Sequence, residues 1–464
     1  MFLQTSLAFL SVALALAAAG HALLHKSKPQ SAFGWIALCL MLPVGGALLY
    51  YLFGINRVKT RARKLRSGQS QPAAPHTTTV HPRPEVESFA RLGHALTGLP
   101  LVGGNRVEML HDGEQAYPAM LEAIRQASRR VFLSTYIFDR DSVGRQFVTA
   151  LGEAVARGVD VRVLLDGIGE LYSLPPVHRL LRKAGVQHAH FLPPKLFPPS
   201  FHVNLRNHRK ILVTDDETAF VGGMNIGDRH LVQTNNPGRV VDLHFRCRGP
   251  IVTQITSVFV QDWQFITGES LPLVPPDPAA SGGALCRVVT DGPEEDLDRL
   301  GELLIGAIGS AQHQVSIMTP YFLPPRELIA TVQVAALRGV DVAVILPAQN
   351  NLPYVHRATR RMLLDLLQRN VRIYYQPPPF VHSKLLVVDG HYALIGSANI
   401  DTRSLRLNFE LTVEVYDSSF ADELCRHFQA VRARSSAVTL EDVSRLPLAT
   451  RLIDSVAWLF SPYL

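Results

Sequence analysis

Cysteine is scarce in this chain of 464 residues, and its distribution excludes a thiolate metal site. The four cysteines are Cys39, Cys247, Cys286 and Cys425, and no two of them stand at the short spacing of a zinc ligand pair. We expect reduced thiols, as in a cytoplasmic domain. The sequence also lacks a glycine-rich nucleotide-binding motif. These absences predict a protein that uses no metal and no cofactor.

Acidic residues are missing from the first 84 positions, which hold nine lysines or arginines. The whole chain has 46 basic and 39 acidic residues, so 37 basic and 39 acidic residues remain beyond position 84. That remainder has a net charge near −2. Nucleic-acid enzymes usually concentrate positive charge on their binding face. The charge distribution therefore argues against nucleic acid as a partner.

Charged side chains are also missing from two long apolar stretches, Phe2 to Leu24 and Ala32 to Asn56. Each exceeds the roughly 20 residues that a helix needs to cross a bilayer. Only a short turn around Lys26 separates them, so residues 1–56 are predicted to form a transmembrane hairpin with spans at about 2–24 and 32–54. Pro43 predicts a kink in the second span. A cleavable signal peptide is the alternative for the first stretch, although no basic residue precedes its apolar core.

A basic segment and a linker, residues 57–84, follow the second stretch. The basic residues nearest the membrane are Arg57, Lys59, Arg61, Arg63, Lys64 and Arg66. Positive charge marks the cytoplasmic end of a membrane span, so the rest of the chain is predicted to be cytoplasmic. The same residues should contact an anionic membrane surface.

One motif occurs twice with every interval preserved. The first copy is His208, Lys210, Asp215, Gly222 and Asn225, and the second is His382, Lys384, Asp389, Gly396 and Asn399. A second copy with the same trailing glycine and asparagine makes a chance origin unlikely. The duplication delivers two histidines, two lysines and two asparagines.

These paired residues fit the chemistry of a phosphodiester, which repels anionic nucleophiles. A neutral imidazole can attack phosphorus and form a covalent intermediate. A second, protonated imidazole can protonate the leaving alkoxide and later accept a proton from the incoming alcohol. Lys210 and Lys384 would bind the non-bridging oxygens as fixed cations, and Asn225 and Asn399 would donate hydrogen bonds to them. No metal is required.

The acidic residues of the motif and its surroundings have less direct roles. Asp215 and Asp389 each end an apolar run that is typical of a strand, which favours a structural role. Glu410 and Asp242 follow the motifs and could each orient an imidazole by accepting its second N–H. The alternative for both is an ordinary solvated or salt-bridged carboxylate.

The remaining sequence is organised as two related halves. Arg157-Gly158-Val159-Asp160-Val161 returns as Arg338-Gly339-Val340-Asp341-Val342, each after an amphipathic helical pattern and at the start of an apolar run. We predict an α/β fold with a first domain at 85–267, a Pro- and Gly-rich linker at 268–283, and a second domain at 284–464. The apolar end of the chain, Leu452 to Leu464, is predicted either to form an interfacial helix or a lid, or to pack into the core.

These motifs resemble those of the phospholipase D superfamily. More narrowly, the stretches Asn207 to Lys210 and Asp401 to Glu410, together with Thr319-Pro320-Tyr321-Phe322, resemble the bacterial cardiolipin synthases. The resemblance covers nearly the whole chain. It implies two phospholipase D-like domains with mixed sheets flanked by helices, in a pseudo-two-fold arrangement that builds one active site from both motifs.

The same resemblance implies an enzyme of the bacterial inner membrane, a multi-pass protein. It implies that two phosphatidylglycerols, as donor and acceptor, condense to cardiolipin and glycerol through a phosphatidyl-histidine. His208 would be the nucleophile and His382 the general acid and base, because the N-terminal motif usually supplies the nucleophile in similar enzymes. A phospholipase D or a phosphatidylserine synthase would use the same residues with another acceptor. A phospholipase D-type nuclease is the alternative of another class.

Overall fold

The structure is a computed structural model that describes residues 2–26, 29–55, 84–194, 205–234, 236, 238–274, 282–292 and 298–461. The basic segment at 57–66 and most of the predicted linkers lie outside the described residues. The chain forms two units, the N-terminal unit of residues 1–70 and the C-terminal unit of residues 71–464.

The N-terminal unit contains one helix that is long and apolar enough to cross a membrane. This is the part of α1 (Phe2–His25) from Thr5 to His25. The second predicted span, 32–54, is not a single helix. It is divided into α2 (Pro29–Met41), α3 (Pro43–Leu49) and a π-helical turn η1 (Tyr50–Gly54).

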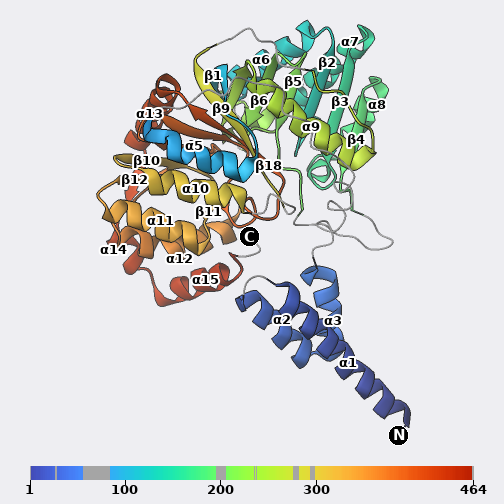
Figure 1. The fold of residues 1–464 in the computed structure, drawn as a ribbon, viewed down its shortest axis with the longest axis vertical. Helices are drawn as coiled ribbons and strands as arrows, with labels where there is room; N and C mark the ends of the chain where they lie inside the picture. The colour runs from blue at the N-terminus through green and yellow to red at the C-terminus, as the bar shows by residue number, and fades with distance from the viewer. Residues whose placement is uncertain are drawn as a thin grey trace. The chain divides into compact units, whose positions relative to one another are not determined.

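The chain turns back on itself between α2 and α3. The backbone of Leu42 leaves the helical conformation, and Pro43 starts the next helix without an amide hydrogen to offer to the previous turn. Trp35 and Tyr50 then pack edge to face, with ring centroids 5.3 Å apart, and α2 lies beside α3 (Figure 1). The chain was predicted to kink at Pro43, and it reverses its direction there. The hydrophobicity of the sequence could not predict this, because a straight helix and a folded-back pair of helices can have the same apolar composition.

The C-terminal unit, residues 71–464, is built on one sheet, in which fifteen of the described strands are hydrogen-bonded side by side. Its first half contains β1 (Val102–His111), β2 (Arg130–Thr135), β3 (Asp160–Asp166), β4 (Gln187–Phe191), β5 (Ile211–Thr214), β6 (Thr218–Gly222) and β8 (Leu243–Arg248). Its second half contains β9 (Ala284–Asp291), β10 (Gln314–Met318), β12 (Asp341–Pro347), β13 (Arg372–Gln376), β15 (Leu385–Val388), β16 (Tyr392–Gly396), β18 (Glu410–Tyr416) and β19 (Ser436–Val438).

The strand order is the same in both halves when it is counted outward from the centre. The first half runs β1-β8-β6-β5-β2-β3-β4, and the second runs β9-β18-β16-β15-β10-β12-β13, with β19 at the far edge. The antiparallel pair β1 and β9 joins them. Both halves combine parallel pairs, such as β2 with β3 and β10 with β12, with antiparallel ones. The predicted duplication and mixed sheet are confirmed.

Helices cover both halves of the sheet. Those of the first half are α6 (Asp112–Gln126), α7 (Ser142–Ala156), α8 (His178–Lys183) and α9 (Ile251–Thr267), and those of the second are α10 (Arg299–Ser310), α11 (Arg326–Leu337), α12 (Pro353–Leu367) and α13 (Ser418–Ala433). Each half has its own apolar core, made from the inner faces of its helices and the β-branched residues of its central strands.

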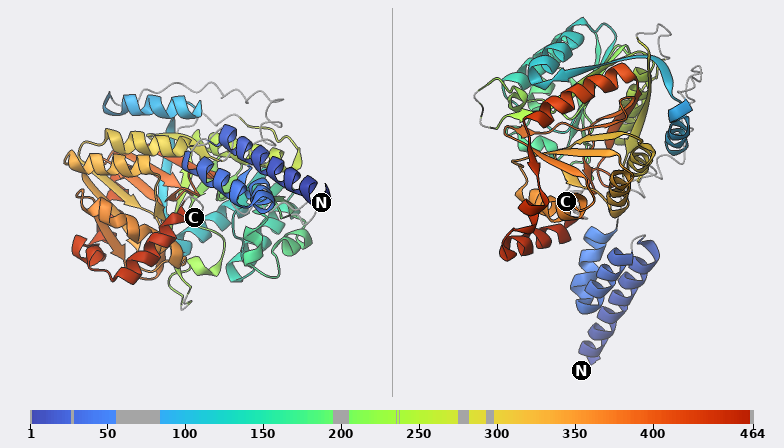
Figure 2. Two further views of the ribbon diagram at one scale, coloured as in Figure 1. Left: turned by 90° about the horizontal axis from the view of Figure 1, so that it is seen from below. Right: turned by 90° about the vertical axis from the view of Figure 1, so that its left-hand side faces the viewer.

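Helix α5 (Pro84–Thr97) packs on the second half, although the sequence placed it at the start of the first domain. Val86, Phe89 and Ala90 on one face join the core of the second half beside α10. Figures 1 and 2 show α5, in light blue, next to the yellow α10. Its amphipathic pattern predicts a buried face and cannot identify the partner that covers it.

The C-terminal helix α15 (Leu448–Leu459) lies on α12 and turns much of its apolar face outward. Asp454 is buried and pairs with Arg360 of α12 (2.6 Å). The exposed large apolar residues around it are Leu448, Leu452, Ile453, Val456, Trp458, Leu459 and Phe460. Because these side chains are exposed, packing of this segment into the core, which was one of its predicted placements, does not account for them.

Candidate active site

The two motifs are brought together by short strand contacts that cross between the halves. β14 (Phe380–Val381), just before the second histidine, pairs with β7 (Val240–Val241) of the first half. On the other side, Asn207 forms a bridge with Phe409 of the second half. Each motif is thus held by backbone from the opposite half.

Backbone hydrogen bonds fix both histidines in these contacts. The amide of His208 donates to the carbonyl of Phe409 (2.9 Å), and the amide of His382 donates to the carbonyl of Val241 (2.8 Å). Because Glu410 follows Phe409 and Asp242 follows Val241, each histidine lies next to a carboxylate from the other half. The pseudo-two-fold arrangement of the sheet therefore continues into the site.

Each imidazole is hydrogen-bonded to one of these carboxylates through Nδ1. His208 Nδ1 lies 2.9 Å from Glu410 Oε1 and 3.1 Å from Oε2, and His382 Nδ1 lies 2.8 Å from Asp242 Oδ2. Glu410 and Asp242 are fully buried. A carboxylate at Nδ1 places the ring proton there and leaves the lone pair of Nε2 available for attack or proton transfer.

Burial makes both imidazoles weak bases before substrate binds. It lowers the pKa of His208 to about 4, and the attraction of Glu410 only partly opposes this. Burial likewise lowers the pKa of His382 well below its usual value, and Lys384 and Lys210 add to the effect. Both rings are therefore neutral near pH 7 in the free site. An anionic phosphate between them would favour protonation of one ring.

The two carboxylates differ in their electrostatic surroundings. Burial disfavours the charge of Glu410, but His208 and Lys210 outweigh it and leave the pKa of this carboxyl lowered. Burial raises the pKa of Asp242, and the attraction of Lys384 does not fully compensate. Glu410 is the better-stabilised anion of the two.

The lysines lie behind the histidines. Lys210 Nζ donates to the carbonyl oxygen of His208 (2.7 Å), and Lys384 Nζ donates to that of His382. Burial lowers the pKa of Lys210 to about 7 and that of Lys384 to about 8. Each ammonium keeps two further N–H donors for a phosphate.

The two asparagines have different partners. Asn225 Oδ1 accepts a hydrogen bond from the amide of Ile137 (3.1 Å). Asn399 Nδ2 donates to Ser404 Oγ (3.1 Å), and its buried Oδ1 has no partner among the described residues. Both asparagines line the cleft described below, where the sequence placed them for phosphate binding.

The motif aspartates contact backbone and do not line the cleft formed by the described residues. Asp215 and Asp389 adopt positive φ angles of 53° and 50° in equivalent turns. Each accepts three backbone amides at 2.7 to 2.9 Å, those of Ser128, Arg129 and Arg130 for Asp215, and those of Gln312, His313 and Gln314 for Asp389. They anchor the starts of β2 and β10. This position fits the structural role that the sequence favoured for both aspartates.

A cleft of about 1050 Å³ lies between the halves and contains both histidines. Its wall includes aromatic side chains for which no role in the site was predicted, among them Tyr136 and Tyr321. The ring of Tyr136 lies 5.4 Å from that of His208, and Lys210 Nζ lies 5.6 Å from the Tyr136 centroid. Tyr136 directly follows Thr135 at the end of β2, and Tyr321 stands two residues after Thr319, which directly follows β10, a regularity that could have identified them.

The cleft wall also carries cationic side chains that the motif search missed. The arginines that line it are Arg206, Arg229, Arg239 and Arg403. Arg229 is paired with Asp139 (2.6 Å), and Arg206 contacts the buried Asp166 (3.3 Å). None of these arginines is a position of the repeated motif. The spacing of that motif therefore could not distinguish them from other arginines.

Two family models match the chain. The model for "Cardiolipin synthase, PLD-like domain" matches residues 120–263 and 304–432, one segment in each half. The model for "Phospholipase_D-nuclease N-terminal" matches residues 13–54, within the N-terminal unit.

Curated relatives are similar over nearly the full length. A cardiolipin synthase of Geobacillus kaustophilus is 32% identical over 453 residues, which covers 95% of this chain and 90% of the relative. A cardiolipin synthase A of Pseudomonas putida is 33% identical over 463 residues, which covers 97% of this chain and 96% of the relative.

Among solved structures, a phosphatidylserine synthase of Haemophilus influenzae has a similar fold. It superposes with a TM-score of 0.62 and 16% sequence identity, over 81% of this chain and all of that structure. At this identity the likeness concerns the fold alone.

Proposed function

This chain belongs to the cardiolipin synthase family of phospholipase D-like proteins, and on that premise we propose that it condenses two phosphatidylglycerols to cardiolipin and glycerol. The chain is an enzyme that transfers phosphatidyl groups. The observation that carries the specific proposal is the pair of neutral imidazoles in one cleft, each hydrogen-bonded to a buried carboxylate of the opposite half.

In the proposed first step, Nε2 of His208 attacks the phosphorus of one phosphatidylglycerol. A P–N bond forms, the P–O bond to the glycerol headgroup breaks, and protonated His382 gives its proton to the departing alkoxide. Glu410 accepts the hydrogen bond from Nδ1–H of His208 throughout and stabilises the positive charge that the ring gains. Free glycerol leaves, and the phosphatidyl group stays on His208.

In the second step, His382 takes the proton from a headgroup hydroxyl of another phosphatidylglycerol. The resulting oxygen attacks phosphorus, the P–N bond breaks, and cardiolipin is released with His208 neutral again. Lys210 and Lys384, with Asn225 and Asn399, would stabilise the non-bridging oxygens in both steps. An acceptor anchored in the same membrane reaches a much higher local concentration than a soluble alcohol.

We propose that the N-terminal unit anchors the protein in the inner membrane, and that residues 71–464, the catalytic unit, lie on the cytoplasmic side. The family and the apolar α1 support membrane association. Lys26 Nζ donates to the carbonyl of Gly54 (2.6 Å), so α3 and η1 bring the chain back to the end of α1. Lys26, at the end of α1, and Gly54, at the end of η1, therefore lie on the same side, and basic residues near membrane spans favour the cytoplasmic side.

The folded-back α2 and α3 give a topology that differs from a multi-pass hairpin. With α1 as the crossing helix and α2–α3 as a short returning pair, the N-terminus lies outside the cell. The two-span arrangement predicted from the sequence would keep the N-terminus in the cytoplasm. Labelling Ser6→Cys in intact cells with a thiol reagent that does not cross membranes distinguishes them, because only an outside N-terminus reacts. Cys425 of the catalytic unit should stay unlabelled in either case.

The test of function uses the purified full-length protein, with phosphatidylglycerol in mixed micelles as its substrate. We expect cardiolipin and free glycerol in equal amounts, and excess glycerol should drive the reaction backward. Phosphatidic acid as the main product would indicate a phospholipase D. If phosphatidylglycerol alone yields no cardiolipin and serine is readily phosphatidylated, the proposal fails and the protein is a phosphatidylserine synthase.

A further inference from the structure

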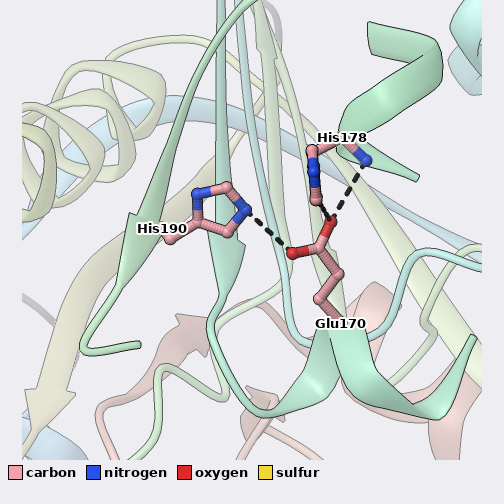
Figure 3. A group of neighbouring side chains, drawn as sticks. All are labelled: Glu170, His178 and His190. Carbon is pink, nitrogen blue, oxygen red and sulfur yellow. Dashed lines mark hydrogen bonds and ion pairs between the residues drawn. The ribbon is translucent and has the colours of Figure 1, made fainter. Parts of the chain in front are cut away.

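A cluster of three metal-binding side chains lies in the first half, apart from the two motifs. Glu170 comes from the 3₁₀ turn η2 (Gly169–Tyr172), His178 from the start of α8, and His190 from the edge strand β4. Figure 3 shows the two imidazole rings directed at the carboxylate from different sides. None of the three residues takes part in the proposed transfer reaction.

The contacts in this cluster are short and partly shielded from solvent. His178 Nδ1 lies 2.7 Å from Glu170 Oε1, and His190 Nε2 lies 2.8 Å from Oε2. The carboxylate side chain is only 8% exposed, whereas the rings are 27% and 29% exposed. Among the described residues, both ion-pair partners of this buried acid are histidines. It therefore lacks the permanently charged partner that buried carboxylates usually have.

The three potential ligand atoms all lie within 4.8 Å of one another. Ligand atoms about 2.1 Å from a tetrahedral zinc ion are roughly 3.4 Å apart, so small side-chain rotations would seat an ion. Two imidazole nitrogens and one carboxylate oxygen form a zinc-type donor set, while calcium and magnesium prefer oxygen ligands alone. A third ring, His188, stands two residues before His190 on the same face of β4, with centroids 5.8 Å apart.

We propose that Glu170, His178 and His190 bind one divalent transition-metal ion, with Zn²⁺ as the best match. The ion would take the place of the protons that the carboxylate now accepts from the two rings, and it would satisfy the buried charge. Zinc-site motifs did not reveal it, because the ligands come from a turn, a helix and a strand without a repeated spacing.

The site would stabilise one wall of the catalytic cleft. The turn η2 that carries Glu170 also carries Tyr172, which lines the cleft and lies 6.2 Å from the ring of Tyr136. A metal would tie η2 to α8 and β4 and so fix the position of this wall. The ion acts on stability, and the proposed transfer chemistry proceeds without it.

The test measures metal binding by the untagged full-length protein in detergent after treatment with a chelator. Incubation with Co²⁺ followed by gel filtration should leave about one equivalent per chain, with the visible d–d absorption of nitrogen and oxygen coordination. Zn²⁺ should displace the Co²⁺ and raise the Tm. In His178→Ala with His190→Ala, affinity should fall by more than about 100-fold, beyond the loss expected for an outer-shell partner.

The control variant is His313→Ala, which removes an exposed histidine of the second half and should bind metal like the wild type. If the double variant does not fold by circular dichroism, His190→Gln alone provides the same comparison at a partly exposed edge position. The proposal is overturned if the wild type retains no Co²⁺ after gel filtration. It is equally overturned if the folded variants retain as much Co²⁺ as the wild type.

Discussion

The first half contributes an aspartate beside a glycine to the active site, whereas the second half contributes a glutamate beside a serine. A side chain at Gly223 has no room, since its Cβ would lie 2.8 Å from both carboxylate oxygens of Asp242. At the equivalent place, Ser397 Oγ donates to Glu410 Oε2 (2.5 Å). The two halves therefore reach the same imidazole–carboxylate contact with different support for the negative charge.

This difference bears on the roles proposed for the two histidines. Hydrogen bonds from His208 and Ser397 and the attraction of Lys210 keep the pKa of Glu410 lowered, while burial raises the pKa of Asp242. A nucleophilic imidazole carries a positive charge throughout the lifetime of its phosphoryl intermediate, so it benefits more from a stable anion. The comparison favours His208 as the nucleophile and His382 as the acid and base.

Removing each histidine in turn is the strongest way to break this assignment. His208→Ala should lower turnover by more than about 10⁴-fold and abolish the covalent intermediate. His382→Ala should also be slow, yet it should accumulate phosphatidyl-enzyme from a donor whose leaving group needs no proton. Acid-free peptide mapping after rapid quenching measures the adduct. A phosphoramidate on residue 382 would reverse the roles.

Neutralising the two carboxylates sharpens the comparison. Glu410→Gln should lower kcat by about 10³-fold, because His208 loses both its orientation and its counter-charge. Asp242→Asn should cost less, about 10²-fold, since the charge it removes is already poorly stabilised. Single-turnover kinetics with labelled lipid separates the two steps. Equal losses in both steps for both variants would contradict unequal roles.

The pH profile tests the lysines that stand behind the two histidines. Lys210 and Lys384 bind phosphate only when protonated, and their pKa values are lowered to about 7 and about 8. Therefore kcat/KM, which reports the free enzyme, should fall as pH rises through 7 to 8. On the acid side, kcat/KM should be lost as the nucleophile His208 is protonated near pH 4. Lys210→Arg should move the alkaline limb upward, and an unchanged limb would assign it to another group.

The serine–glycine difference predicts a smaller effect. Ser397→Ala removes one hydrogen bond to a charged group, worth about 1.5–3 kcal/mol, and should slow turnover roughly 10- to 100-fold. Ser397→Thr keeps the hydroxyl and is the matched control. If Ser397→Ala has full activity, the hydrogen bond does not support the charge of Glu410, and the two halves are electrostatically equivalent.

The smallest catalytic effect is expected at the motif aspartates. Asp215→Ala and Asp389→Ala each remove hydrogen bonds to three backbone amides and should lower the free energy of unfolding by about 2 kcal/mol. The folded fraction should keep nearly normal kcat. Burial would raise the pKa of Asp215, but hydrogen bonds from Ser128 and Arg130 lower it, so its contribution to stability should be lost as pH falls through that lowered value. Denaturant titrations measure the first effect, and a selective loss of kcat in either folded variant would point to a direct catalytic role.

Much of this site could be predicted from the sequence, because the repeated spacing preserves both the residue types and their order in each half. The duplication followed from recurring helix and strand patterns, and the mixed sheet followed from the family resemblance. The crosswise pairing did not, since Asp242 and His382 are 140 positions apart and no local pattern encodes which acid meets which histidine. The partner of α5 and the reversal at Pro43 were missed for the same reason, because both depend on contacts distant in the chain.

The crossed contacts also constrain how the two halves can change over evolutionary time. A substitution in β18 that displaces Glu410 disables the histidine of the first half and leaves its own half's histidine paired. Exchange of one complete half with a homologue would therefore pair the resident imidazole with a foreign acid and the foreign imidazole with the resident acid. Each acid would keep the residue beside it, Gly223 with Asp242 or Ser397 with Glu410, because both lie in the same half. Duplication thus produced two mutually dependent copies, and neither can drift alone.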